Sequence, residues 1–256
     1  MNSFFRLYGI KTPLLTKGSQ ISLILADSIR SSEAKTLEQG DIIVIAESPL
    51  ATVEGNIIEL DKVIPSREAC IIAKQYKIEP EFAQVVLNES DSVIGGIPGF
   101  ILSLKNGTLL PNAGVDHSNA PPGSVVLLPA DPDKSAERIA NELEKIFKVQ
   151  IAVIVGDSRT HPLRVGSAGV AIGCYGIDSV IDDRGNFDLF NRELLVTKRA
   201  IADNIVSAAE IVMGEAAEST PVALIRGLGL PLTRSSGIET ILPSECLFIG
   251  TFRPDL

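Results

Sequence analysis

The sequence has no surplus of basic charge. Its 256 residues include 23 Lys and Arg against 32 Asp and Glu, which gives a formal net charge of −9. A protein that binds nucleic acid needs clustered basic side chains to displace the counterions of the phosphate backbone. The Lys and Arg residues here are scattered along the chain, so the composition predicts no nucleic-acid partner.

Long apolar runs are missing as well. Purely apolar segments such as 125–128 and 151–155 are far shorter than the roughly 20 residues that a membrane-spanning helix needs. Residues 1–8 have neither the basic n-region nor the apolar h-region of a secretory signal. A hydrophobic share of 45% and a charged share of 21% are typical of a globular protein. We therefore expect a cytoplasmic protein that does not enter a membrane.

Cysteine is scarce and unpaired in pattern. The three cysteines, Cys70, Cys174 and Cys246, are far apart and form no CxxC motif. This spacing suggests neither a disulfide framework nor a thiolate zinc site. We expect all three to be small buried hydrophobic residues.

The common catalytic and nucleotide-binding motifs are also absent. The sequence has no GxSxG, no GxxxxGK[ST] loop and no GxGxxG that opens a helix. Its two histidines, His117 and His161, fit no Ser/His/Asp arrangement, and we expect them to be loop imidazoles rather than metal ligands. These absences predict a protein without a nucleophilic triad, in which another device binds any nucleotide.

Alternating strand and helix patterns are present along the whole chain and predict a mixed α/β fold. No low-complexity linker separates parts of the chain, so we expect one unit over residues 1–256, or two closely packed subdomains without a linker. Helices are expected over residues 21–30, 66–77, 80–88, 133–147 and 200–213, and strands over 41–46, 124–128, 151–155, 221–225 and 246–251. Ser19 and Asp133 are the expected N-caps and Gly214 the expected helix stop. The pair Asn106-Gly107 predicts a type I′ hairpin within residues 100–110.

Three carboxylates stand where the predicted elements end. Asp116 lies in a Gly-containing loop, Asp157 directly follows the strand over 151–155, and Glu215 follows Gly214. With the hydroxyl of Ser158, they are oxygen ligands of the kind that a hard divalent cation takes together with water and substrate phosphates. The same residues could serve as turn or cap residues, because Asp in loops often binds its own backbone. Spacing alone leaves both interpretations open.

At these same residues the sequence resembles a known family, the coenzyme F420-0:gamma-glutamyl ligases. The likeness runs from Gly9 to Gly227, and its most specific segments are NAGVDHSN at 112–119, LPADPDKSA at 128–136, GDSRTHPLRVG at 156–166, NREL at 191–194 and MGEAAESTPVALIRG at 213–227. The resemblance implies an unusual α/β fold that forms an intertwined homodimer. It also implies an enzyme that uses GTP and Mn²⁺ or Mg²⁺ to attach L-glutamate to the deazaflavin coenzyme precursor.

The resemblance further implies residue roles. Asp116 and Asp157 would hold one cation, and Ser158 and Glu215 would hold another. The implied nucleotide contacts are Thr12, Pro13, Leu14, Leu15, Ser48, Asn119, Met213, Gly214, Glu215, Ala216, Ala217, Glu218, Ser219 and Thr220. The γ-phosphoryl group would pass to a carboxylate of the precursor, and the glutamate amine would attack the resulting acyl phosphate, with the cations neutralising the phosphates. No protein nucleophile is required.

Two further readings stay open because of departures from the family pattern. Glu47 stands where the family has a small hydroxyl residue, Thr52 stands at a lysine position, and Thr160-His161 replaces Gly-Arg. Losing a charge-assisted contact to phosphate costs on the order of 1.5–3 kcal/mol. The alternatives are a related ligase with a different nucleotide or acceptor, and a non-catalytic homodimer that binds nucleotide or metal.

Overall fold

The computed structural model describes residues 4–252 and has a mixed α/β fold, as predicted. The chain forms two compact units. The first unit combines the residues up to Gly55 with Pro129–Ile238, and the second combines Asn56–Leu128 with the residues from Glu239 onward. Among residues 4–252, no helix combines the length and the apolar character needed to cross a membrane.

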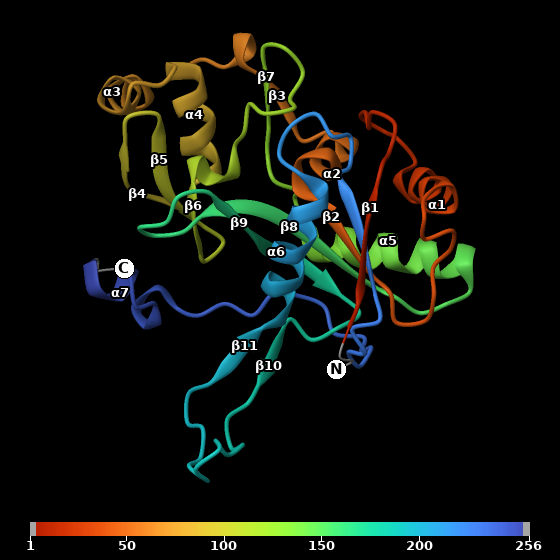
Figure 1. Ribbon diagram of the computed structural model, residues 1–256. Helices are drawn as coiled ribbons and strands as arrows, with labels where there is room; N and C mark the ends of the chain where they lie inside the picture. Colours follow the sequence, from red (N-terminus) through yellow and green to blue (C-terminus); the bar gives the residue numbers. More distant parts are fainter. Residues whose placement is uncertain (1–3, 253–256) are drawn as a thin grey trace. The chain divides into compact units, whose positions relative to one another are not determined.

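A five-stranded mixed sheet forms the centre of the first unit (Figure 1). Its strand order is β1-β12-β2-β8-β9, and only β2 and β8 run parallel to each other. The strands are β1 (Arg6–Ile10), β12 (Val222–Arg226), β2 (Ile42–Ala46), β8 (Ala152–Thr160) and β9 (Ser167–Tyr175). The central strands β2 and β12 are almost continuously apolar because both of their faces are buried.

Helices cover both faces of this sheet. Helices α1 (Ile21–Ser31) and α5 (Pro132–Phe147) pack on one face, and α6 (Ile201–Met213) packs on the other (Figure 1). Alternation along β2 assigns Ile43 and Ile45 to the core under α1 and α5, while Ile42 and Val44 join the core under α6. The apolar stripe predicted for the helix over 133–147 is confirmed, since its residues are buried or packed against the core on one face of α5.

Both predicted N-caps in this unit are wrong by a few positions. Helix α1 begins after Gln20, because the hydroxyl of Ser19 instead accepts a hydrogen bond from the Thr16 amide. Helix α5 is capped by Asp131, whose carboxylate accepts from the Lys134 amide, so that Pro132 can occupy the first turn. Asp133 lies inside the helix, and its carboxylate accepts a hydrogen bond from the backbone of β9.

Carboxylates from two helices cover the edge strand β9. Asp133 on α5 accepts a hydrogen bond from the Cys174 amide at 2.8 Å, and Asp203 on α6 accepts one from the Ala171 amide at 2.9 Å. An edge strand otherwise presents unpaired amides that can recruit another strand. Burial raises the pKa of Asp133 despite this hydrogen bond.

The strand predicted over 151–155 continues further than expected. Asp157 and Ser158 do not end the strand but lie inside β8, which extends to Thr160 after a bulge between Val155 and Gly156. The segment that follows, which contains several glycines and for which no element was predicted, forms β9. The prediction failed because polar and glycine residues have a low strand propensity. Residues 156–160 are a strand because they pair with β9.

Besides β1 and β9, three elements of the first unit were not predicted. Helix α2 (Glu47–Glu54) follows β2 directly and ends at Gly55, whose φ of 85° lies in the left-handed region. Strands β10 (Val180–Asp182) and β11 (Lys198–Ala200) form an antiparallel ribbon that projects from the unit (Figure 1). We call residues 180–200 the arm.

Within residues 56–128, the second unit contains a three-stranded meander, a two-stranded pair and two α-helices. The elements are β3 (Ile57–Glu59), η1 (Leu60–Lys62), α3 (Arg67–Tyr76), α4 (Pro80–Glu89), β4 (Ser92–Ile97), β5 (Phe100–Lys105), β6 (Thr108–Pro111), η2 (Asn112–Gly114) and β7 (Ser124–Val126). The predicted hairpin is confirmed, because Asn106 and Gly107 both have positive φ between β5 and β6. Both predicted helices are also confirmed.

The prediction of a strand over 246–251 is wrong. The segment instead contains η3 (Pro243–Glu245) and a short helix, α7 (Ile249–Phe252). Its backbone closes a helical turn, because the Gly250 amide donates to the Cys246 carbonyl at 2.7 Å. The prediction for the cysteines is correct for Cys174 only, since Cys70 is exposed and Cys246 is partly exposed; all three are free thiols.

Candidate functional site

One row of paired residues crosses the central sheet close to the ends of its strands, where the candidate site lies. Ile10 pairs with Val222, Val222 pairs with Ile45, and the next residue, Ala46, pairs with Gly156. Residues predicted to bind nucleotide or cation adjoin this row at four places: residues 12–15, Ser48, residues 157–158 and residues 213–220. The register of the sheet therefore gathers segments that are far apart in the sequence.

The two longest predicted nucleotide segments touch each other. The Thr12 amide donates a hydrogen bond to the Ser219 carbonyl at 3.1 Å. Thr12 and Leu15 are buried and fix their segment, while Pro13 and Leu14 are exposed. The structure thus places both segments at one position on the sheet edge.

The loop over 213–220 follows α6 directly. Gly214 ends the helix with a φ of 73°, as predicted for a helix stop. Within the loop, the Ala216 amide donates to the Glu218 carboxylate at 2.7 Å, and the Thr220 hydroxyl donates to the Glu218 carbonyl. Met213 and Thr220 are buried at its two ends, and Gly214, Glu215, Ala216, Ala217, Glu218 and Ser219 are exposed. The loop is anchored at both ends and presents its middle to solvent.

Ser48 lies in the first turn of α2, beside the same row. Its hydroxyl donates a hydrogen bond to the Glu47 carboxylate at 2.5 Å. The Ala46 amide, which precedes them, donates to the Pro221 carbonyl at 3.0 Å. This bond ties the start of α2 to the end of the 213–220 loop.

Acidic and hydroxyl groups meet where β8 passes the end of α6. The Ser158 hydroxyl donates to the Glu215 carboxylate at 3.2 Å. Asp157 precedes Ser158 on the strand, and Glu210 lies on the last turns of α6. The structure therefore brings two of the four predicted cation ligands, Ser158 and Glu215, into direct contact.

Two glycines allow α6 to approach β8 and β9 closely enough to form this cluster. A Cβ atom on Gly156 would overlap the Cγ1 atom of Val206, and one on Gly169 would lie 2.6 Å from the Val206 carbonyl carbon and 2.7 Å from the Ser207 amide. The Ser207 hydroxyl also donates to the Gly169 carbonyl at 2.8 Å. The absence of side chains at these positions seats the helix on the strands.

Glu210 is a member of the cluster that the sequence analysis missed. Burial, followed by repulsion from Glu215 and from Asp157, raises the pKa of Glu210 to about 7, against a hydrogen bond from the Gly169 amide that lowers it. Glu210 therefore lies within electrostatic range of both Glu215 and Asp157. The helical pattern could have located Glu210 on the last turn before the Gly214 stop, but no motif distinguished it.

Asp157 has a buried cationic neighbour. The Nε atom of Arg159 donates to the Oδ2 atom of Asp157 at 2.8 Å. The two side chains lie on one side of β8 because they are two residues apart. This pair was also missed, because Arg159 read as part of a polar loop.

The remaining predicted ligands, Asp116 and Asn119, belong to the second unit. Asp116 bridges to Val126, and its carboxylate accepts a hydrogen bond from the Ser118 amide at 3.0 Å. Asn119 is exposed in a turn with a φ of 56°. Next to them, the His117 ring stacks on Phe82 with ring centroids 4.6 Å apart.

The donor set in the first unit suits a hard cation. Asp157, Glu215 and Ser158 offer carboxylate and hydroxyl oxygens, which Mg²⁺ and Mn²⁺ prefer to nitrogen or sulfur. Within residues 4–252, however, no three His, Cys, Asp or Glu side chains are already arranged to hold a metal ion. Cation binding by Asp116, Asp157, Ser158 and Glu215 stays a prediction.

Comparison with known proteins adds to this geometry. A family described as F420-0:Gamma-glutamyl ligase matches residues 9–227. The coenzyme F420:L-glutamate ligase of Methanocaldococcus jannaschii is 42% identical over 238 residues, which cover 93% of each chain. The ligase of the same name from Methanopyrus kandleri is 42% identical over 207 residues, covering 80% of this chain and 82% of the relative. That of Methanothermobacter thermautotrophicus is 38% identical over 226 residues, covering 88% and 89%.

Identity at this level over most of both chains defines an enzyme, and its class is that of the amino-acid ligases. The chain belongs to the F420-0:gamma-glutamyl ligase family. The membership inferred from the sequence motifs is confirmed. The matched region includes β8 and β9, whose glycine and polar residues do not form a typical strand pattern in the sequence.

Proposed function

We propose that this protein joins L-glutamate to the deazaflavin coenzyme precursor F420-0, with GTP as the energy source and Mn²⁺ or Mg²⁺ as the cation. The relatives' shared name supports the glutamate and coenzyme part of this proposal. In the reaction, the γ-phosphoryl group of GTP passes to the precursor carboxylate and leaves GDP. The glutamate amine then attacks the acyl carbon, loses a proton and expels phosphate, so that an amide forms.

The observation that carries the proposal is the convergence of segments at one sheet edge. The Thr12 amide bonds the Ser219 carbonyl, and the Ser158 hydroxyl bonds the Glu215 carboxylate. The segments proposed to contact the nucleotide and the oxygen ligands proposed for the cation therefore lie at the same end of the sheet, which supports a site for a metal–nucleotide complex. A divalent cation would neutralise the repelling carboxylates and the phosphates together.

The role of the cation follows from charge. The protein carries a formal net charge of −9, and its proposed substrates are anions. Asp157 and Glu215 turn part of this acidic surplus into a site that attracts a cation, and the cation then attracts phosphate. We expect GTP to bind poorly when divalent metal is removed.

The proposal includes a homodimer. The arm exposes five large apolar side chains around its tip, namely Phe187, Leu189, Phe190, Leu195 and Val196. Exposed apolar clusters of this kind mark protein–protein contacts. We expect light scattering to give about twice the chain mass of 27.3 kDa. Phe190→Asp should shift the protein toward the monomer, and Ile64→Asp, at another exposed apolar residue, should not.

The enzyme assay tests the proposed reaction directly. We expect phosphate release from GTP to require F420-0, L-glutamate and Mn²⁺ together, with the glutamylated coenzyme identified by mass spectrometry. Asp157→Ala should reduce turnover by more than about 100-fold through loss of a cation ligand. Asp61→Ala, at an exposed carboxylate of η1, is the matched control.

The outcomes separate the alternatives. Turnover with another nucleotide or acceptor alone would replace GTP or F420-0 in the proposal. Nucleotides other than GTP should be tested because the hydroxyl of Ser48, a predicted nucleotide contact, already donates a hydrogen bond to the Glu47 carboxylate. Binding of nucleotide without turnover under any combination would contradict an enzymatic function.

A further inference from the structure

Arg159 is a buried cation next to the proposed cation site. The residue is 8% exposed, although it lies between exposed residues on β8. Its Nε atom donates to the Oδ2 atom of Asp157 at 2.8 Å. Within residues 4–252, Ser92 Oγ is the only fully buried side-chain polar atom without a hydrogen-bond partner, so the Nη atoms of Arg159 are accessible to solvent or to a ligand.

The terminal nitrogens of Arg159 are not satisfied by protein. Within residues 4–252, the side chain of Arg159 makes one hydrogen bond, from Nε to Asp157, and neither Nη atom has a hydrogen-bond partner. Arg226 shows the contrast. Its Nη1 atom pairs with Glu38, and its Nη2 atom donates to Asp41 and to the Thr36 carbonyl.

An oxyanion is the natural complement of the two free Nη groups. A guanidinium presents its donors as a planar fork, which matches two oxygens of a phosphoryl or carboxylate group. Asp157 engages Nε and thereby fixes the direction of the fork. Because Asp157 is also a proposed cation ligand, the guanidinium and the cation would act on neighbouring oxygens.

We propose that the two Nη groups of Arg159 bind the terminal phosphoryl group of the nucleoside triphosphate, beside the cation held by Asp157. This inference rests on the proposed function. The phosphoryl group is favoured over a substrate carboxylate because the adjacent oxygen ligands are those of a metal–phosphate site. Positive charge at this position would stabilise the phosphoryl group as it is transferred.

A purely structural role makes a different prediction. If Arg159 only neutralised Asp157, its removal would weaken the cation site and would lower the affinity for every metal-bound nucleotide alike. A contact to the terminal phosphoryl group instead affects GTP and spares GDP. The ratio of the two dissociation constants therefore distinguishes the roles.

The experiment measures equilibrium binding of GTP and GDP, each with saturating Mn²⁺, by titration calorimetry on the full chain. We expect Arg159→Met to weaken GTP binding by about 10- to 100-fold and to leave GDP binding nearly unchanged. Arg159→Lys keeps a charge for Asp157 but loses the fork, so its loss for GTP should be smaller. Arg30→Met removes the exposed ion pair with Asp27 and should change neither constant.

Other outcomes overturn the inference. Equal weakening of GTP and GDP would assign Arg159 to the support of Asp157, and unchanged binding of both would exclude any contact. A loss confined to L-glutamate, measured in a parallel titration, would replace the phosphoryl group by a carboxylate. If wild-type protein fails to bind GTP with Mn²⁺, the proposed function fails instead. Arg159→Lys provides the same comparison if Arg159→Met does not fold.

Discussion

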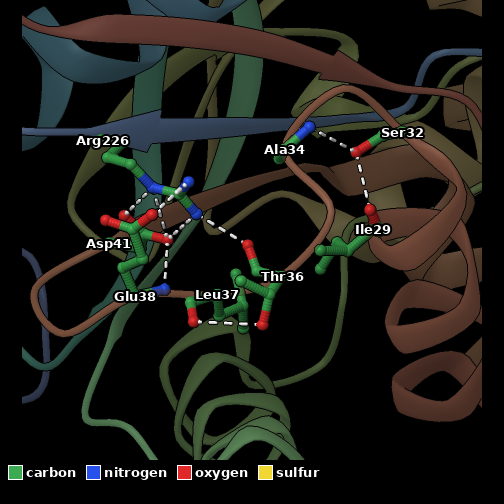
Figure 2. Close-up of polar contacts among 8 residues, drawn as sticks. All are labelled: Ile29, Ser32, Ala34, Thr36, Leu37, Glu38, Asp41 and Arg226. Atoms are coloured by element: carbon green, nitrogen blue, oxygen red, sulfur yellow. Dashed lines mark hydrogen bonds and ion pairs between the residues drawn. The ribbon is translucent and has the colours of Figure 1, made fainter.

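The guanidinium of Arg226 forms a bidentate ion pair with the carboxylate of Asp41 in the first unit (Figure 2). Nε lies 3.0 Å from Oδ1, and Nη2 lies 2.7 Å from Oδ2. Asp41 is 1% exposed and also accepts the Glu38 amide, while the Thr36 carbonyl accepts from Nη2. The pair joins the end of β12 to the turn that leads into β2, and so fixes two of the strands that carry the site.

Breaking this pair should destabilise the protein strongly. We expect Asp41→Ala to lower the free energy of unfolding by about 3–5 kcal/mol, because the largely enclosed Arg226 side chain, 14% exposed, would lose its main counter-charge. Urea denaturation at neutral pH measures the change. Asp27→Ala breaks the exposed pair with Arg30 and should cost less than about 1 kcal/mol. Similar losses for the two variants would contradict the stabilising role of burial.

The close approach of α6 to the sheet gives a second prediction. Gly156→Ala should destabilise the protein by about 1–3 kcal/mol, because the new Cβ atom would overlap the Val206 side chain. Val206→Ala in the same chain should recover much of that loss. It should not rescue Gly169→Ala, whose Cβ atom meets backbone of α6. Thermal unfolding of the single and double variants gives the coupling energies, and purely additive effects would refute this packing.

Glu210 should make stability depend on pH. Its folded pKa of about 7 exceeds the ordinary value of 4.5, so the folded state binds more protons between these values. Stability should therefore fall as pH rises from about 4.5 to 7. Glu210→Gln should flatten this dependence in metal-free buffer.

Urea titrations at several pH values provide the measurement for Glu210. Glu137→Gln, at an exposed position on α5, is the control and should keep the wild-type slope. An unchanged slope for Glu210→Gln would show that neither burial nor repulsion from Glu215 and Asp157 raises the pKa of Glu210 in solution.

Thiol reactivity should distinguish the cysteines. Burial, together with the nearby Asp133 and Asp178 charges, raises the pKa of Cys174 to about 12, whereas Cys70 is exposed on α3. Iodoacetamide at pH 8 should label Cys70 and leave Cys174 unmodified until denaturant is added. Peptide mapping by mass spectrometry reports both sites. Labelling of Cys174 as fast as Cys70 in the native protein would contradict its burial.

Local patterns predicted most of the helices and hairpins. The stripe on α5 and the Asn106-Gly107 turn are set by residues close in sequence, so their periodicity and turn chemistry suffice. Local patterns misplaced Asp157 and the Gly-rich strand β9. Gly156 and Gly169 weaken a strand locally, and their value appears only when α6 packs across them.

The candidate site shows the same division. The motifs identified Asp157, Ser158 and Glu215 because a motif preserves residue type and order. Glu210 and Arg159 could not be identified, since a Glu in a helix and an Arg in a polar stretch are usually solvent-exposed. These two residues are recognised as part of the site only in the structure, where both are at least partly buried and both lie near Asp157.

The sequence by itself determined the family, the alternation of strands and helices, and the acidic surplus of −9 that a cation would have to offset. The tertiary structure decided which parts of that surplus converge. Sheet register aligned Ile10, Val222 and Ile45 in neighbouring strands, and two glycines let α6 bring Glu210 near Asp157. These relationships depend on backbone pairing and close packing between distant segments, which no local pattern in the sequence encodes.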